Sequence, residues 1–180
     1  MNMKKLSVTE LRLVKTNIEL DAPESISDLW EAARLFEKAF DMSNQAQELF
    51  CAIFMDELSH IVGIEKIVAG SAKEFTGSNH ELFKRCLLHN ATRMILCHNH
   101  VTRNAQPSFE DLELTWNIIQ TGLPLGVSVE EHLVISERKF FPIVSAFAWG
   151  RYSPEKDVSG EGLKEIYKRI ESLPSSSIDG

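Results

Sequence analysis

The sequence predicts an α/β (α+β) domain in which helices flank a mixed, mostly antiparallel β-sheet. Short apolar runs of the kind found in strands are interleaved with three or four amphipathic stretches of helical period. Several strand-like segments also follow one another over short polar turns, which favours antiparallel neighbours. The length of 180 residues suits a single core.

The individual elements follow from the period of the apolar residues and from the capping and turn residues between them. Apolar residues that recur every three or four positions predict helices, whereas alternating or short continuous runs predict strands. These signals predict an edge strand around residues 11–14, a helix from Ser27 or Asp28 to Asp41, strands at 49–55 and 60–68, a helix at 79–89, a strand at 93–97, a helix at 109–120, a hairpin of 127–136 and 139–143, a helix at 162–173 and a frayed tail from Pro174.

The composition is that of an ordinary globular protein from a reducing compartment. A formal net charge of −7 argues against a broad surface for nucleic acid, although Lys84, Arg85 and Arg93 leave room for a local basic patch. The three cysteines show no CxxC spacing, which favours free thiols over disulfides. Because the sequence has neither an apolar run of membrane-spanning length nor an apolar signal core, we expect a cytoplasmic protein without a membrane partner.

Two histidines separated by one residue follow the expected strand 93–97. Side chains at positions i and i+2 of a strand point to the same side, so His98 and His100 can converge on one cation. A catalytic zinc site usually has three protein ligands and one position open for water. Asp111, in the first turn of the next expected helix, is the natural third ligand. Zinc is the expected metal, one per chain, although this donor set can also hold manganese or iron.

The same residues also have purely structural interpretations. Neighbouring histidines are often only core or surface residues. Ser108 and Asp111 form a capping box at the start of the helix, and a carboxylate there is favoured by the helix dipole without any metal. What favours the metal is the combined spacing, His98-x-His100, seven residues, Ser108, two residues, Asp111.

This spacing resembles the signature of the JAMM (JAB1/MPN) metalloprotease-like domains. The segments Leu96-Cys-His-Asn-His100 and Pro107-Ser-x-x-Asp-x-x-x-Thr115 resemble the RadC branch of that family, and the similarity extends from about Gln47 to Val144. RadC-like proteins usually have Pro-Ser-Gly after the second histidine, whereas Val-Thr-Arg stands at 101–103 here. This difference puts in question the path of the loop and the substrate groove beside the metal. A helix-hairpin-helix segment is not evident in residues 1–45, so the chain resembles the shorter RadC form.

The resemblance implies a JAB/MPN (cytidine-deaminase-like) fold and a zinc-dependent metallopeptidase or isopeptidase acting on a peptide or protein. Metal-bound water would attack an amide carbonyl, Glu65 would exchange protons with that water, and Ser108 would stabilise the oxyanion. The corresponding organisation is an N-terminal extension with one helix packed on the core (1–45), a RadC-like JAMM/MPN domain (46–150) and a C-terminal helix and tail (151–180).

Several residues near this pattern have two interpretations. Glu65 is either the acid/base residue or a strand residue paired with a lysine; Asp56 and Glu57, in a turn, are weaker rivals. His132 either orients a metal ligand or is a core or rim histidine. Asn99 and Cys97 should point away from the histidines, and we expect a structural hydrogen bond from the first and a buried thiol from the second.

Two other functions compete with hydrolysis. A nucleic-acid-interacting protein, associated with DNA repair or a mobile element, would bind duplex DNA in a strongly salt-dependent manner. A non-catalytic interaction module would use its metal for stability alone and would unfold on chelation. Assembly into a homo-oligomer stays open.

Overall fold

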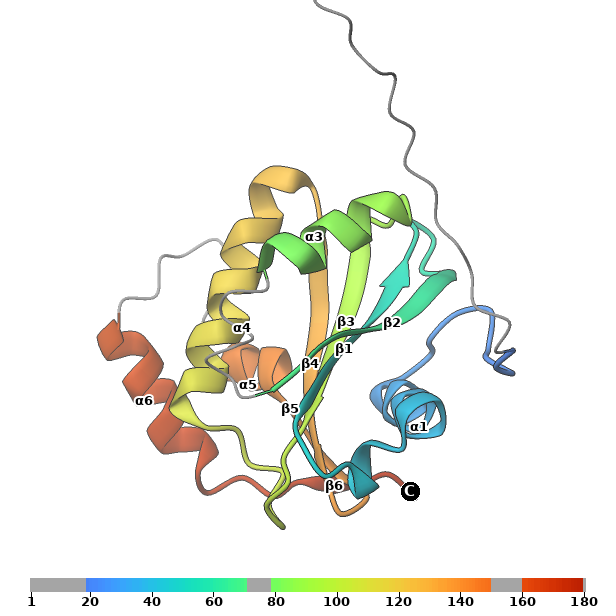
Figure 1. The fold of residues 1–180 in the computed structure, drawn as a ribbon. Helices are drawn as coiled ribbons and strands as arrows, with labels where there is room; N and C mark the ends of the chain where they lie inside the picture. The colour runs from blue at the N-terminus through green and yellow to red at the C-terminus, as the bar shows by residue number, and fades with distance from the viewer. Residues whose placement is uncertain (1–18, 71–78, 150–159, 180) are drawn as a thin grey trace, which may run out of the picture.

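The structure is a computed structural model, and it describes residues 19–70, 79–149 and 160–179 (Figure 1). The edge strand expected around residues 11–14 lies outside these ranges. In chain order the elements are α1 (Leu29–Phe40), η1 (Met42–Asn44), β1 (Leu49–Met55), β2 (Ile61–Ala69), α3 (Asn79–Leu88), β3 (Arg93–Asn99), α4 (Phe109–Gly122), η2 (Leu123–Leu125), β4 (Ser128–Ser136), β5 (Lys139–Pro142), α5 (Ile143–Trp149), α6 (Gly160–Ile170) and β6 (Ser176–Ser177).

The strands form one mixed, mostly antiparallel sheet in the order β2-β1-β3-β4-β5-β6, which confirms the expected fold class. Only β3 and β4 pair in parallel; β1 with β2, β1 with β3, β4 with β5 and β5 with β6 are antiparallel. Parallel neighbours need a crossover connection, and α4 supplies it. The loop 100–108 therefore joins the carboxyl end of β3 to the first turn of α4.

Strand β1 lies between β2 and β3, and its two faces pack against different helices. Cys51, Ile53 and Met55 belong to the apolar cluster that contains α1, whereas the alternate residues Phe50 and Phe54 belong to the cluster with α3 and α4. All seven residues of β1 are buried. The sheet is thus covered by α1 on one face and by α3 and α4 on the other (Figure 1).

A third apolar cluster lies between α4, α5, α6 and the end of the sheet. Helix α5 has no counterpart among the expected elements. Its first N–H groups, at Val144 and Ser145, donate to the buried carboxylate of Glu131 over 2.6 and 3.1 Å. Because this capping group comes from β4 and not from the residues next to the helix, the local sequence carries no signal for it.

The expectation of a frayed tail from Pro174 is wrong. Ser176 and Ser177 pair with β5, and the side chain of Ile178 is fully buried in the cluster that contains α1. The Arg138 guanidinium holds the next residue, Asp179. The tail therefore covers the outer edge of β5, which would otherwise expose unpaired backbone groups.

Across the three described ranges, no helix combines the length and the hydropathy that a bilayer crossing requires.

Candidate metal centre

His98, His100 and Asp111 meet where β3 ends and α4 begins. The two imidazole Nε2 atoms are 3.1 Å apart, and the Asp111 oxygens lie 3.2 Å from His100 Nε2 and 3.3 Å from His98 Nε2. Ligand atoms at the corners of a tetrahedral zinc site, with bonds of about 2.0–2.1 Å, are separated by about 3.3–3.4 Å. The spacing of this group therefore fits one tetrahedral cation, and the three residues could hold a metal ion.

The hydrogen bond at the far side of His100 shows which of its nitrogens is free. Its Nδ1 lies 3.1 Å from the carbonyl oxygen of Asn104. A carbonyl can only accept, so Nδ1 carries the hydrogen and Nε2 of the neutral ring presents a lone pair. This lone pair faces a carboxylate oxygen, and two acceptors at 3.2 Å repel unless a proton or a cation lies between them. These donor atoms are therefore stabilised by a positive charge placed between them.

Asp111 is a buried carboxylate in contact with both imidazoles and with Ser108. Burial opposes its ionisation, but the His98 and His100 imidazoles and the Ser108 hydroxyl hold the pKa of Asp111 far below its ordinary value. Both the N–H and the hydroxyl of Ser108 donate to Oδ2 over 2.7 Å, and the Asp111 N–H donates back to the Ser108 hydroxyl. The expected capping box is confirmed, and it links Ser108 to Asp111, a member of the candidate triad.

The structure does not bring Glu65 to this triad. Glu65 lies opposite Ala52 of β1, which lies opposite Leu96 of β3. His98 is two residues further along β3, so the Cα atoms of Glu65 and His98 are about 12 Å apart by strand geometry. The Glu65 carboxylate is held by Arg85 (2.6 Å) and His89 (2.7 Å), and not by the lysine considered as its partner.

A different glutamate, Glu48, precedes the strand that pairs with β3 beside His98, and its charge acts on His100. Burial lowers the pKa of His100, but the adjacent Asp111, the Asn104 carbonyl and the charge of Glu48 together raise it above its ordinary value. Glu48 directly precedes β1, whose Phe50 pairs with His98. Sequence reasoning missed Glu48 because its proximity comes from the pairing of β1 with β3. The one local signal is a glutamate at the start of a fully buried strand.

The residue between the two histidines fixes the backbone on both sides of Glu48. The Asn99 side chain accepts from the Leu49 N–H over 2.7 Å and donates to the Gln47 carbonyl over 3.3 Å. The expectation of a structural hydrogen bond from Asn99 is confirmed. Cys97 lies in the cluster on the α1 side of the sheet, away from the triad, and its burial raises the pKa of the thiol well above its ordinary value.

His132 is buried against the triad and not at its rim. Its Nε2 lies 2.8 Å from His98 Nδ1, and its Nδ1 lies 2.6 Å from the Thr115 hydroxyl. Burial and the neighbouring His98 lower the pKa of His132 well below its ordinary value. Of the two interpretations of this residue, the contact to a ligand is therefore the one that the geometry favours.

Comparison with known proteins identifies the family. The model of the RadC-like JAB domain matches residues 26–146, which is more than half of the chain. The chain belongs to the RadC-like JAB domain family. Among its relatives, a UPF0758 protein of Picosynechococcus sp. is 33% identical over 100 residues, 56% of this chain and 41% of the relative. A UPF0758 protein of Clostridium beijerinckii is 25% identical over 130 residues, 72% of this chain and 53% of the relative. The chain thus spans about two fifths to one half of the length of these relatives.

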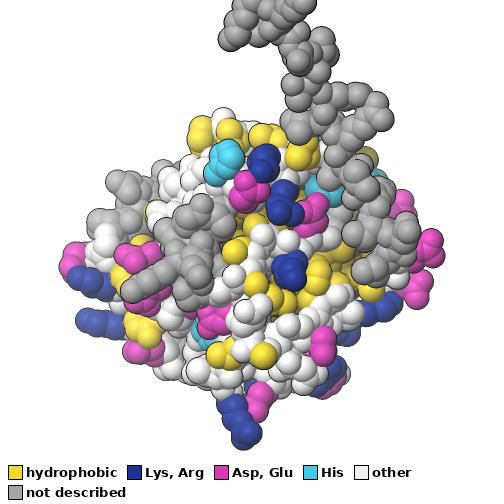
Figure 2. All heavy atoms as spheres, in the orientation of Figure 1, with side chains coloured by type: hydrophobic (Ala, Val, Ile, Leu, Met, Phe, Trp, Pro, Cys, Tyr) yellow, Lys and Arg dark blue, Asp and Glu magenta, His cyan; other side chains and the backbone are white. Residues whose placement is uncertain are grey.

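The local basic patch that the sequence left open in this RadC-like chain is neutralised. The three cations concerned, Lys84, Arg85 and Arg93, each contact a carboxylate at 2.5–2.9 Å, from Glu81, Glu65 and Glu130 respectively. Basic and acidic side chains are also intermixed on the face of the molecule in Figure 2. The geometry of these residues gives no support to a phosphate-binding surface.

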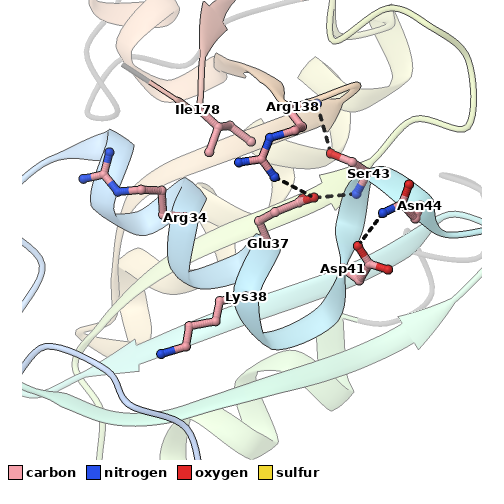
Figure 3. A pocket seen from close by; sticks show the side chains of 8 residues that line it. All are labelled: Arg34, Glu37, Lys38, Asp41, Ser43, Asn44, Arg138 and Ile178. Carbon is pink, nitrogen blue, oxygen red and sulfur yellow. Dashed lines mark hydrogen bonds and ion pairs between the residues drawn. The ribbon is translucent and has the colours of Figure 1, made fainter.

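A surface pocket of the RadC-like domain lies between α1, η1, the turn after β4 and the tail (Figure 3). None of the triad residues lines it. Its two central charges, Glu37 and Arg138, already pair with each other at 3.7 Å, and Arg138 also binds Asp179. We therefore place the candidate site at the triad and not in this pocket.

Proposed function

We propose that this RadC-like chain is a zinc-dependent hydrolase that cleaves an amide or isopeptide bond of a peptide or protein. The observation that carries the proposal is the convergence of two imidazole nitrogens and a carboxylate within 3.1–3.3 Å, with Glu48 just before β1, the strand that pairs with the one carrying His98. His98, His100 and Asp111 would hold the Zn²⁺, which when bound would supply a Lewis acid that polarises a carbonyl and lowers the pKa of a bound water toward about 7.

We assign the proton transfer to Glu48 in place of Glu65. The Glu48 charge acts on His100, and Asn99 holds the backbone on both sides of Glu48 next to the triad. Glu48 takes a proton from the attacking water and delivers it to the leaving amine. Glu65 is unsuited to this task because Arg85 and His89 occupy its carboxylate.

Ser108 is the proposed donor to the oxygen that becomes negatively charged as the carbonyl is attacked. It lies at the start of α4, where the backbone N–H groups of the first turn also favour negative charge. Its hydroxyl donates to Asp111 Oδ2 over 2.7 Å. We propose that this hydrogen turns to the substrate oxygen when a cation neutralises the carboxylate.

The test compares two glutamine variants in the same assay. The purified chain should contain about one zinc per molecule by elemental analysis, as expected for a single triad. On a quenched-fluorescence peptide library and a lysine-linked isopeptide, Glu48→Gln should keep the zinc and lose turnover. Glu65→Gln is the matched control, and it should keep both.

The opposite pattern, with turnover lost in Glu65→Gln and kept in Glu48→Gln, would show that Glu65 and not Glu48 transfers the proton. Purified protein without metal, or His100→Ala protein with the native zinc content, would overturn the proposed centre. A wild-type chain that holds zinc, unfolds on chelation and cleaves none of the probes would instead favour the non-catalytic interaction module.

A further inference from the structure

A chain of three hydrogen bonds runs from the backbone of α4 to the metal-facing His98 through buried groups. The Thr115 hydroxyl lies 2.6 Å from the Asp111 carbonyl oxygen and 2.6 Å from His132 Nδ1, and His132 Nε2 lies 2.8 Å from His98 Nδ1. Thr115 and His132 are 0% exposed and His98 is 1% exposed. Water therefore does not compete for these bonds.

The direction of every hydrogen in this chain follows from its first member. A carbonyl oxygen has no hydrogen, so the single hydroxyl hydrogen of Thr115 must lie between its Oγ1 and the Asp111 carbonyl. Thr115 Oγ1 therefore accepts from His132, whose hydrogen is on Nδ1. A buried imidazole is neutral and has only one N–H, so His132 Nε2 accepts from His98 Nδ1.

The consequence for the ligand is specific. With its hydrogen on Nδ1, His98 presents the Nε2 lone pair to His100 and Asp111. The other tautomer would place a hydrogen at the point where a cation has to bind. Helix α4 thus contributes twice, because it carries Asp111 and, one turn later, the Thr115 hydroxyl that sets the tautomer of His98.

We propose that His132 and Thr115 are positioning residues that fix His98 as an Nε2 metal ligand. The proposal rests on the proposed function, because it concerns the same centre. Partners of this kind that orient a ligating histidine typically contribute about 10–100-fold to metal affinity. His132 acts through His98, and Thr115 acts only through His132.

The tautomer is measured directly in the metal-free wild-type protein by long-range ¹H–¹⁵N correlation spectroscopy of the histidine rings. We expect His98 with its hydrogen on Nδ1 and His132 with its hydrogen on Nδ1. In Thr115→Val, where the hydroxyl acceptor is lost, the His132 and His98 signals should move toward the Nε2–H tautomer. A wild-type His98 that carries its hydrogen on Nε2 would overturn the proposal, whatever the metal affinity.

The second measurement is zinc affinity, obtained by competition with a chromophoric chelator. His132→Leu should weaken zinc binding about 10–100-fold. His132→Gln, which keeps an acceptor for His98 Nδ1–H, should restore most of the affinity. Thr115→Val should weaken binding on its own and add nothing in the His132→Leu background, as expected if it acts through that residue alone.

Thr121→Val is the matched control. Thr121 is on the same helix and makes the same hydroxyl-to-carbonyl bond four residues back, at 2.7 Å, but it is exposed. The zinc affinity of the Thr121→Val variant should equal that of the wild type. Wild-type protein that binds no zinc would sink the proposed function, whereas wild-type and His132→Leu proteins that bind zinc equally would sink only the positioning role. If His132→Leu fails to fold, the Gln variant and Thr115→Val decide the question.

Discussion

Replacing Asn99 by alanine tests how the segment that carries Glu48 is held against β3. The side chain of Asn99 is 1% exposed and makes two hydrogen bonds to the chain around Glu48, one at 2.7 Å and one at 3.3 Å. Alanine removes both of them. Because Asn99 alternates with His98 along β3, the ligands on the other face of the strand keep their environment.

The magnitude follows from what each lost bond leaves behind. The Leu49 N–H belongs to a residue only 4% exposed, and leaving such a donor unpaired costs about 1–3 kcal/mol. Gln47 is exposed, so its carbonyl can be hydrated again, and this longer bond contributes about 0.5–1 kcal/mol. We expect Asn99→Ala to lose about 1.5–4 kcal/mol of unfolding free energy, which lowers the Tm by about 3–16 °C at this chain length.

The assay is thermal and urea unfolding of the zinc-loaded protein, with zinc affinity measured in parallel. Zinc affinity should remain near that of the wild type, and turnover should fall because Glu48 is no longer held. Asn117→Ala is the control, since Asn117 is exposed on α4 and alanine is a better helix former. A loss of stability no larger than that of the control, or the loss of zinc binding, would refute the reasoning.

Four further results are expected. Ile178→Ala should cost about 2–5 kcal/mol in urea unfolding because the side chain is fully buried, and an unchanged midpoint would contradict a docked tail. Burial raises the pKa of Glu65, but hydrogen bonds from His89 and Arg85 lower it below the ordinary value of 4.5. The wild type should therefore be more stable than Glu65→Gln above pH 4.5. This difference in unfolding free energy should vanish as the pH falls through the lowered pKa of Glu65. A stability difference between the wild type and Glu65→Gln that grows as the pH falls would contradict a lowered pKa of Glu65. Cys97 should not react with an exposed-thiol reagent until the protein unfolds, because it is fully buried. Free zinc at 100 times its Kd should stabilise the chain by at most about 2.7 kcal/mol, which is the value for an ion that does not bind the unfolded chain, and a Tm insensitive to zinc would argue against the centre.

The parts of the site that sequence predicts are those encoded by neighbouring residues. The alternation of a strand places His98 and His100 on one side, and the capping box fixes Ser108 and Asp111 at a helix start. Both are local rules, and the four side chains lie together in the structure. The strand and helix boundaries near them follow for the same reason, because their apolar periods are strong.

The remaining parts depend on which strands pair and in which register. Glu48 reaches the triad because β1 pairs with β3, and His132 because Leu96 of β3 lies opposite it on β4. Glu65 has the right residue type on the right face of the sheet, but it is two strands away and beside α3. The capping of α5 by Glu131 and the docking of the tail are also long-range contacts. Such contacts are not encoded in a window of neighbouring residues.

The three side chains of the candidate metal centre come from a stretch of chain that runs only from residue 98 to residue 111. Closing so short a loop costs little entropy, so β3, the loop and α4 can gather the ligands before the rest of the sheet is paired. A cation can then act as a template for this segment during folding. We therefore expect zinc to accelerate refolding. We also expect zinc to stabilise the protein by less than its affinity for the folded chain implies, because the unfolded chain binds the same ion.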